Sequence, residues 1–484
     1  MREIIIDPVT RLEGHGKITI FLDERGDVEN AYFQVPELRG FEKFCEGRRA
    51  EDLPIITPRI CGVCPVAHHM ASAKACDSAF NVEPTETAKK LRELEYCGYI
   101  IYDHTLHFYF LGGPDFIMGP EAPPAKRNIL GVIEKVGLNV AKEVIKHRAY
   151  GQKITAIIGG RQTHPVTAVP GGISKALSET ERREIEKMVK SCIKFAEFTV
   201  QLFHEIVLEN TRYLEMIKSE AYTLRTYYMG MVDEDNKVNF YDGKVRVVDT
   251  EGKEFVKFSP EEYLDVIGEH VEPWTYVKMP YLKRVGWKGL TAGPENGIYR
   301  VGPLGRLNAA DGMATPLAQE EYKEMYRTLG GKPVHSTLAF HWARIIELLY
   351  AAERALELVT DRDITRKDIK NKPGRPGEGV GIVEAARGTL IHHYILDRNA
   401  IARKVNLIVA TTHNMPGICI SVREAAKGLI RGGKVDEGLL NRIEMAFRAY
   451  DPCFACASHF AFGEMPLTVD IYSKDGKLIR RVKR

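Results

Sequence analysis

The chain has 484 residues, 44% of them hydrophobic and 27% charged, a balance typical of a soluble globular protein with a large core. Its formal net charge of +3 excludes the strongly basic composition expected of a nucleic-acid-binding protein. No apolar run is long enough to span a membrane, and no signal peptide follows Met1. Together with an odd number of cysteines, nine, these features predict a cytoplasmic protein whose thiols stay reduced.

The N-terminal half predicts a small sheet followed by long helices. Alternating apolar residues at 17–22 and 28–35, joined by a short polar turn, predict a β-hairpin, and residues 3–7 predict a further strand. Ala-rich or amphipathic segments predict helices at 68–81, 85–110, 128–156 and 178–209. The last helix begins with the capping box Ser178-Glu179-Thr180-Glu181, whereas Gly and Pro residues between 159 and 172 predict an irregular loop.

The second half of the chain begins with a change from predicted helices to predicted strands. Residues 222–303 contain short β segments separated by turns such as Tyr241-Asp242-Gly243, so we expect a mostly β insert on a helical body. Further elements are expected, in chain order, as helices at 319–327 and 338–360, strands at 391–394 and 405–410, and a helix at 439–450. Many helices with small sheets indicate an α+β fold, a single large and predominantly helical domain over residues 1–459.

Two Cys-x-x-Cys pairs lie near opposite ends of the chain, Cys61 with Cys64 and Cys453 with Cys456. Each pair places two thiolates on one turn of backbone, and two pairs can converge to give four soft ligands for one metal site. A redox dithiol and a structural four-cysteine zinc site are the alternatives. In a structural zinc site the two ligand pairs usually lie within one short segment of the chain. Here almost the whole chain separates the two pairs, so we favour a functional metal centre.

Several motifs surround the cysteines in a fixed order. They are Asp7-Pro8-Val9-Thr10-Arg11-Leu12-Glu13-Gly14-His15, Arg39-Gly40-Phe41-Glu42, Arg59-Ile60-Cys61-Gly62-Val63-Cys64 with His68, His107-Phe108-Tyr109, Gly160 to Pro165, Glu384-Ala385-Ala386-Arg387-Gly388, and Asp451 to His459. This ordered set resembles the large subunit of the [NiFe] hydrogenases over essentially the whole chain. The resemblance implies reversible heterolytic cleavage of H2 to protons and electrons. Its soluble, cofactor-coupled branch, F420-non-reducing or NAD-reducing, is the most similar.

The resemblance also implies the ligands of a Ni–Fe centre. Cys61 and Cys453 would be terminal nickel ligands, and Cys64 and Cys456 would bridge nickel to iron. The iron would carry CO and two cyanides, and the hydroxyl of Thr411 would hydrogen-bond a cyanide. Soft thiolates suit both metals, and the site must keep open positions for H2.

A second metal ion is implied near residue 459. Glu42, the backbone carbonyl of Leu407 and His459 match the ligands of a Mg2+ or Fe2+ ion in the family. Carboxylate and carbonyl oxygens suit Mg2+, whereas the imidazole leaves Fe2+ open.

Five further residues would assist catalysis. Glu13 matches the glutamate that takes protons from the thiolates, and Arg387 would lie over the open metal position. Asp115 and Asp451 would orient and balance the guanidinium. His68 would donate a hydrogen bond to the sulfur of a bridging cysteine.

No cysteine cluster is left for Fe–S centres, so the resemblance implies a small Fe–S subunit together with further electron-transfer subunits. The electron acceptor is left open among NAD(P), F420 and a disulfide reductase, with the F420-non-reducing type favoured. Residues 460–484 predict a β-hairpin on Asp475-Gly476, an extension that a C-terminal endopeptidase would remove after His459, with a maturation chaperone assisting. The alternatives are a complex-I-type relative, which would lack the cysteines, and a structural four-cysteine metal protein.

Overall fold

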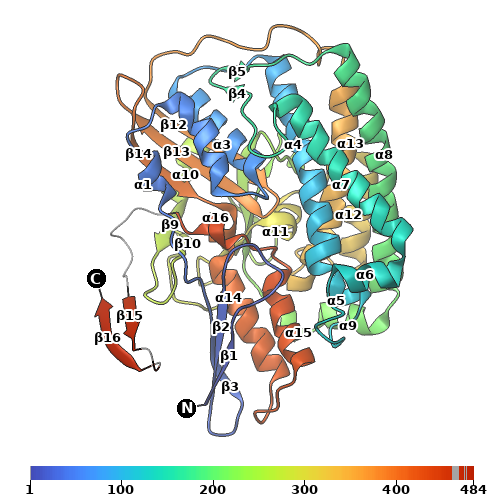
Figure 1. The fold of residues 1–484 in the computed structure, drawn as a ribbon, viewed down its shortest axis with the longest axis vertical. Coiled ribbons are helices and arrows are strands. Elements are labelled where there is room, and N and C mark those ends of the chain that lie inside the picture. The colour runs from blue at the N-terminus through green and yellow to red at the C-terminus, as the bar shows by residue number, and fades with distance from the viewer. Residues whose placement is uncertain (1, 460–467, 474, 476, 484) are drawn as a thin grey trace.

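The computed structural model describes residues 2–459, 468–473, 475 and 477–483. Long helices form one side of the molecule and small sheets form the other, with the chain's last helices between them (Figure 1). This arrangement confirms the predicted α+β class. The predicted start of the extension, residues 460–467, lies outside the described part of the chain, whereas the strands β15 (Thr468–Tyr472) and β16 (Leu478–Lys483) form the predicted hairpin.

The helical side is built from α4 (Glu86–Leu106), α7 (Leu138–Gly159), α8 (Glu179–Phe203), α12 (Pro316–Thr328) and α13 (Phe340–Thr360). Helix α13 is buried along most of its length because α4, α8 and α12 pack around it. Shorter helices complete the layer or position loops: α1 (Phe41–Cys45), α2 (Leu53–Ile56), α5 (Pro114–Ile117), α6 (Ile129–Val136), α9 (Thr211–Lys218), α10 (Tyr263–Val266), α11 (Gly302–Ala309), α15 (Glu437–Arg448) and α16 (Phe454–Ala457).

One helix prediction was wrong, and one helix was missed. The helix expected over 128–156 is two helices, α6 and α7, because Gly137 adopts a φ of 90° between them. The helix α14 (Ala410–Leu429) was not predicted, since the apolar residues at 405–410 continue the strand pattern and Pro416 lies inside the helix. Thr411 therefore lies in the first turn of a helix, directly after a strand.

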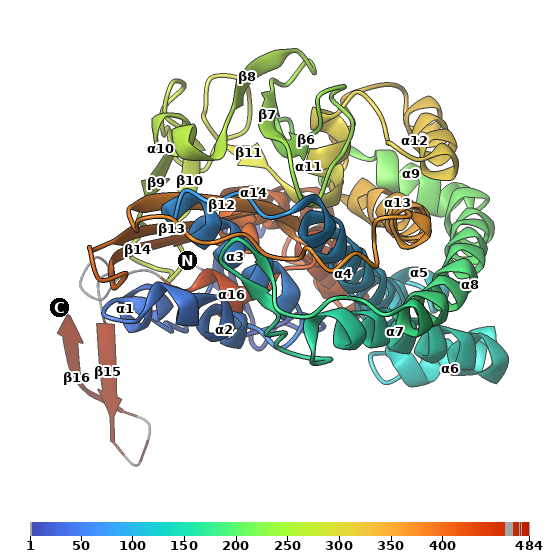
Figure 2. The same cartoon turned by 90° about the horizontal axis from the view of Figure 1, so that it is seen from above.

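The sheets are small and mostly antiparallel. Their strands, in spatial order, are β1 (Arg2–Ile6), β2 (Lys17–Leu22) and β3 (Val28–Gln34); β12 (Glu378–Ala385), β13 (Gly388–Leu396) and β14 (Ala402–Ile408); β11 (Tyr299–Arg300), β6 (Tyr227–Val232), β7 (Lys244–Val248) and β8 (Glu254–Phe258); β10 (Met279–Leu282) and β9 (Ile267–His270); β4 (Ala168–Val169) and β5 (Gly172–Ile173). The sheet β12–β13–β14 lies between α3 (Pro65–Ala79) and the strands β6–β11 (Figure 2).

Helix α3 and strand β12 meet through backbone atoms. A Cβ added to Gly379 would lie 2.1 Å from the Ala79 nitrogen, and one added to Gly381 would lie 2.2 Å from the Ala71 oxygen. Only glycine on the strand opposite alanines on the helix allows this approach. The contact fixes the start of α3 beside the β12–β13 turn, which carries Arg387.

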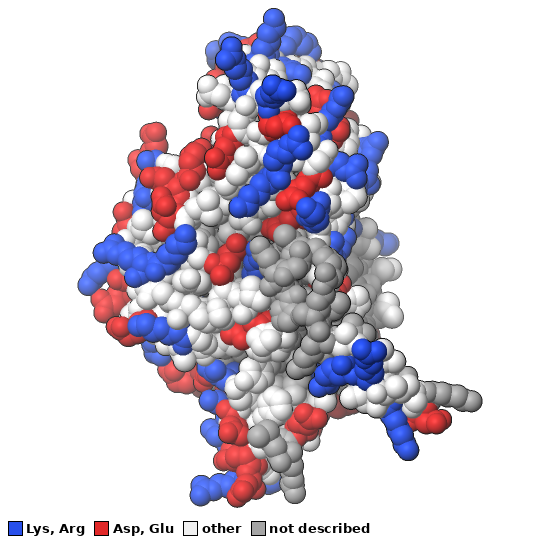
Figure 3. All heavy atoms as spheres, turned by 90° about the vertical axis from the view of Figure 1, so that its left-hand side faces the viewer, with Lys and Arg blue, Asp and Glu red and all other residues white. Residues whose placement is uncertain are grey.

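No helix among the described residues is long and apolar enough to cross a bilayer. On the face shown in Figure 3, lysines and arginines are interspersed with aspartates and glutamates. That face therefore offers no broad field of one charge, in keeping with the near-neutral composition.

Candidate metal centre

The two Cys-x-x-Cys pairs converge on one buried point. Cys61 follows the turn Thr57–Ile60, and Cys64 caps α3, while Cys453 caps α16 and Cys456 lies within it. The sulfur atoms are 3.6 Å apart between Cys61 and Cys453 and 3.5 Å apart between Cys64 and Cys456, and all four lie within 4.8 Å of one another. Four sulfur atoms at these distances can share one metal site.

Two other segments bind the backbone around the cysteine pairs. Around Glu13, the backbone N–H donates to the Pro452 carbonyl at 3.4 Å, and the Phe454 N–H donates to the Glu13 carbonyl at 3.0 Å. The Arg39 guanidinium donates to the carbonyls of Ile60, at 2.5 Å, and Ala455, at 3.3 Å, so that it ties one pair to the other. The motif containing Arg39 was noticed in the sequence, but this role was not predicted.

The cysteines influence one another's protonation. Burial alone would raise the pKa of Cys61, but hydrogen bonds from the other three cysteines and the charge of Arg387 lower it well below its usual value. Burial raises the pKa of Cys453 and Cys456. The group therefore favours one thiolate before metal binds, and the other thiols must release protons on binding.

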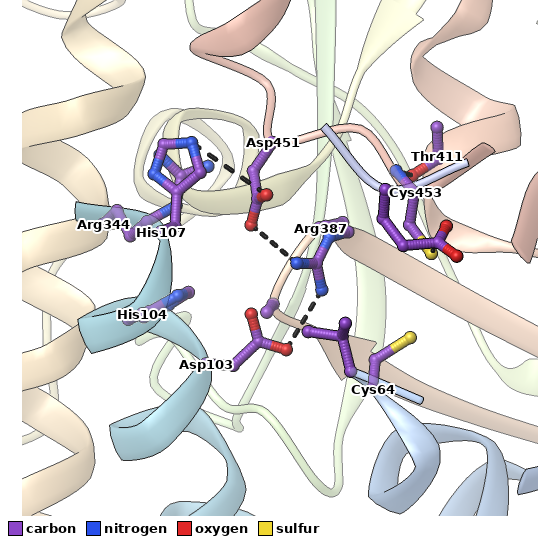
Figure 4. A network of polar contacts seen from close by, with 12 residues as sticks. Cys64, Asp103, His104, His107, Arg344, Arg387, Thr411, Asp451 and Cys453 are labelled. Atoms are coloured by element: carbon purple, nitrogen blue, oxygen red, sulfur yellow. Dashed lines mark hydrogen bonds and ion pairs between the residues drawn. The ribbon is translucent and has the colours of Figure 1, made fainter. Parts of the chain in front are cut away.

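Arg387 lies at the turn between β12 and β13, and its guanidinium lies between the carboxylates of Asp103 and Asp451, next to Cys64 and Cys453 (Figure 4). Its guanidinium nitrogens are 3.0 Å from Asp103 Oδ2 and 3.0 Å from Asp451 Oδ2. Burial raises the pKa of Asp451 to about 7, although Arg387 opposes the rise. Two carboxylates from different elements therefore fix the plane of the guanidinium.

The prediction that Asp115 balances Arg387 was wrong. Its carboxylate instead binds Arg11, Arg448 at 2.8 Å and Asn441 at 3.0 Å. Asp103 binds Arg387 in place of Asp115. Asp103 lies on α4, which passes beside the Arg387 turn, whereas Asp115 follows in the chain after α4 has ended. A charged residue within the apolar helical stretch 96–109 was the available signal, since buried carboxylates need partners.

Glu13 contacts the second cysteine pair directly. Its Oε2 accepts hydrogen bonds from the Cys453 thiol at 2.8 Å and the Ala455 N–H at 3.2 Å. Burial raises the pKa of this carboxyl, and the charge of Cys61 raises it further. The arrangement suits a group that exchanges a proton with a cysteine sulfur.

A very small cavity adjoins the cysteines. Its polar lining comes from Arg387, Thr411 and His68, and its apolar lining from Ala385, Leu390, Val409 and Ala410, beside Cys64, Cys453 and Cys456. Thr411 Oγ1 accepts the Cys453 N–H at 2.9 Å. His68 reaches the cavity, but its Nδ1 bonds to His392, and Nε2 has no partner among the described residues.

The residues predicted for a second metal also come together. Glu42 Oε1 accepts the Leu407 N–H at 2.8 Å, and the Glu42 N–H donates to the His459 carbonyl at 3.1 Å. The carbonyl of Leu407 faces the same side of its strand as the N–H. Neither ring nitrogen of the buried His459 makes a hydrogen bond of normal geometry with described residues, as expected of a metal ligand.

The chain matches the family described as nickel-dependent hydrogenase over residues 39–128 and 141–459, and the one described as HoxL-like over residues 3–38. The chain belongs to the nickel-dependent hydrogenases. It is the large, catalytic subunit of an oxidoreductase that acts on H2. The four converging cysteines fit a nickel–iron site. The family match argues against a structural zinc site, and the presence of all four cysteines argues against a complex-I-type relative.

Relatives of this hydrogenase subunit match along its length. An F420-non-reducing hydrogenase iron-sulfur subunit from Archaeoglobus profundus is 48% identical over 100% of both chains. An F420-non-reducing hydrogenase vhu subunit from Methanocaldococcus jannaschii is 50% identical over 89% of this chain and 100% of its own. A solved NAD+-reducing [NiFe]-hydrogenase is 38% identical, with a TM-score of 0.90 over 95% of this chain and 100% of its own. The Ni-Fe-Se hydrogenase from D. vulgaris Hildenborough gives a TM-score of 0.77 at 25% identity, with the same coverage.

Proposed function

We propose that H2 is cleaved heterolytically in the cavity beneath Arg387 and that Glu13 takes up the resulting proton. When bound, the nickel–iron pair supplies the Lewis acidity and the redox capacity that the reaction requires. The observation that supports the proposal most directly is the placement of Arg387, fixed by Asp103 and Asp451 at the edge of a cavity that three of the cysteines share.

The chain's own groups have separate tasks. The fixed guanidinium of Arg387 stabilises developing negative charge without being deprotonated itself. A proton on the Cys453 sulfur can pass to Glu13 Oε2 across 2.8 Å. The apolar wall excludes water from the cavity, which strengthens both interactions.

We further propose that Cys61 and Cys453 are terminal nickel ligands and that Cys64 and Cys456 bridge to iron. The sulfur distances group Cys61 with Cys453, at 3.6 Å, and Cys64 with Cys456, at 3.5 Å, as this division requires. An apolar cavity with the donors Arg387 and Thr411 also suits an iron that carries weakly polar CO and hydrogen-bond-accepting cyanides.

Metal analysis and infrared spectroscopy of the purified enzyme test the centre. We expect one nickel per large subunit, iron in excess of nickel because the Fe–S subunit adds its own, a Mg2+ or Fe2+ held by Glu42, Leu407 and His459, and absorption bands from CO and cyanide. Zinc alone, without such bands, would contradict the proposal.

We infer that an Fe–S subunit docks beside the first cysteine pair. Cys61 is buried, but Gly62 is exposed, and nothing lies within 4 Å of its missing side chain. His164 Nε2 contacts the Cys61 carbonyl at 3.2 Å, and Arg59 contacts His164 Nδ1 at 3.1 Å. The loop at 161–163 is exposed around them, so exposed surface lies directly beside the first cysteine pair at this point.

The substitution Gly62→Trp is expected to reduce recovery of the Fe–S subunit with the tagged chain by roughly tenfold or more, because the bulky ring would occupy the interface. Metal content of the tagged chain should not change, since Gly62 is exposed and nothing lies within 4 Å of an added Cβ. Glu83→Trp, at another exposed position, is the control. Equal recovery of the Fe–S subunit from both variants would place the interface elsewhere.

We also propose that the chain is processed after His459. The family match ends at residue 459, and the solved NAD+-reducing enzyme corresponds to 95% of this chain, whereas the Archaeoglobus profundus sequence corresponds to 100%. An endopeptidase and a maturation chaperone would then act on residues 460–484. Intact mass of active enzyme from its native host should lack these residues, and an active enzyme that retains Arg484 would refute the cleavage.

The electron acceptor is proposed from the relatives. The F420-non-reducing subunits from Archaeoglobus profundus and Methanocaldococcus jannaschii are 48% and 50% identical to this chain, against 38% for the NAD+-reducing enzyme. We therefore favour transfer to a disulfide reductase partner in the cytoplasm. Rapid reduction of F420 or NAD(P) by the purified complex would contradict this choice.

A further inference from the structure

The backbone just before Arg387 is bound by side chains from distant parts of the chain. The peptide group that joins Ala385 to Ala386 is held at both edges. Its carbonyl accepts a hydrogen bond from Arg306 Nη1 at 2.7 Å, and its N–H donates to the Tyr99 hydroxyl at 3.0 Å. A second nitrogen of Arg306, Nη2, donates to the Ala386 carbonyl at 3.4 Å. The proposed function uses neither Arg306 nor Tyr99.

Arg306 is itself fixed by two buried glutamates. It lies on α11 and is fully buried. Its Nε and Nη2 donate to Glu347 at 2.5 Å and 2.6 Å, and its Nη1 donates to Glu384 at 2.8 Å. Glu347 belongs to α13 and also contacts His104 Nε2 of α4 at 2.9 Å. The planar guanidinium is therefore held from two sides, and its remaining N–H donors stay directed at the turn.

The side chain of Arg387 starts from this turn and ends at the metal cavity. Its guanidinium is bound by Asp103 and Asp451 at 3.0 Å each, and its carbonyl accepts a hydrogen bond from Asn414 at 3.3 Å. The two carboxylates fix the far end of the side chain but not the point from which it starts. Rotation of the preceding peptide group would move that point, and the guanidinium would move relative to the cavity.

We propose that Arg306 and Tyr99 are positioning residues, which fix the peptide plane before Arg387 and thereby keep its guanidinium at the edge of the cavity. Neither residue lines the cavity, so both act through Arg387. Because both are buried side chains on helices, they can hold the turn rigidly. This inference rests on the proposed role of Arg387 in H2 cleavage.

Arg306→Lys tests the proposal through turnover per loaded chain. The lysine keeps the positive charge, but one ammonium cannot bind two glutamates and two carbonyls at once. We expect turnover to fall by roughly tenfold or more, because small displacements of a catalytic group have large effects on rate. In a double-mutant cycle, Arg306→Lys should cause no further loss when Arg387→Lys is already present, whereas independent damage would multiply the two losses.

Amide hydrogen exchange of the purified enzyme measures the turn itself, without relying on turnover. In Arg306→Lys and Tyr99→Phe, peptides that cover residues 384–388 should exchange faster by roughly tenfold or more, because the turn loses a hydrogen bond that holds it closed. Tyr99→Phe should also lower turnover, by less than Arg306→Lys, since it removes one hydrogen bond and leaves both carbonyls bound.

Two buried residues elsewhere in the fold provide matched controls. Arg92 is also fully buried and binds a carboxylate together with the carbonyls of Val169 and Gly172. The buried Tyr326 donates its hydroxyl hydrogen to Asn308 at 2.9 Å. Arg92→Lys and Tyr326→Phe should lower stability, but turnover and amide exchange at the Arg387 turn should keep their wild-type values.

Wild-type turnover, or wild-type exchange at the turn, in both Arg306→Lys and Tyr99→Phe would overturn the inference alone, provided that Arg387→Lys is impaired. Losses that multiply in the double-mutant cycle would overturn it as well. Wild-type turnover in Arg387→Lys would overturn the proposed function, and the inference with it. If Arg306→Lys does not fold, Tyr99→Phe and its own cycle with Arg387→Lys decide the question.

Discussion

Arg387→Lys is expected to lower H2 turnover by roughly 100-fold or more, while nickel and iron contents stay at wild-type levels. The guanidinium contacts Asp103 and Asp451 at 3.0 Å each and still lies at the edge of the cavity. A lysine ammonium is a single point charge on a flexible stem, so it cannot keep both carboxylates bound and remain fixed over the metal position. Turnover per loaded chain, measured by H2-dependent dye reduction, checks this result.

Arg300→Lys provides the matched control for that experiment. Arg300 is also a fully buried arginine, but it bonds to Thr226 and Tyr228 rather than to Asp103 or Asp451, and it does not line the cavity. Its replacement should lower stability without changing turnover per loaded chain. Wild-type turnover in Arg387→Lys would exclude the proposed role, and an equal loss in Arg300→Lys would show that general damage to the core explains the effect.

Glu13→Gln is expected to slow H/D exchange with solvent by about 100-fold or more, with little effect on metal content. The glutamine can still accept the hydrogen bond from the Ala455 N–H, so the local backbone should be kept. It cannot take up a proton from the Cys453 sulfur, which now contacts Glu13 Oε2 at 2.8 Å. Mass spectrometry of the hydrogen isotopes formed from D2 in water measures the rate.

Two comparisons make the result of Glu13→Gln specific. Glu83→Gln changes an exposed carboxylate and should leave the exchange rate at its wild-type value. Electron transfer to a dye should fall together with exchange in Glu13→Gln, because proton removal limits both. Wild-type exchange in this variant would require another proton acceptor at the cysteines.

The sequence predicted most elements of the fold for identifiable reasons. The hairpin of β2 and β3 follows from strict alternation of apolar residues, and the start of α8 follows from a capping box that the structure contains in full. The convergence of the two Cys-x-x-Cys pairs across almost the whole chain was predicted correctly, because four thiols with this spacing have few other uses in a large enzyme.

The errors arose where tertiary contacts override local pattern. The first residues of α14 continue the apolar pattern of the preceding strand β14. The sequence pattern alone therefore does not show that the strand ends at Ile408 and that a helix begins at Ala410. The choice between Asp103 and Asp115 depends on which turn of α4 faces Arg387, and chain order does not contain that information. Similarly, Arg39 ties the two cysteine pairs together through backbone carbonyls, which no side-chain motif reveals.

The backbone contact between α3 and β12 bears on how this enzyme tolerates mutation. Cys64 begins the helix, and Arg387 follows the strand, so the separation of ligand and guanidinium depends on how closely these two elements approach. Gly379 and Gly381 set that approach although neither contributes to the cysteine site or its cavity. Any larger residue at either position must push the helix outward, so the geometry of the reaction is encoded partly by two missing side chains at a distance from it.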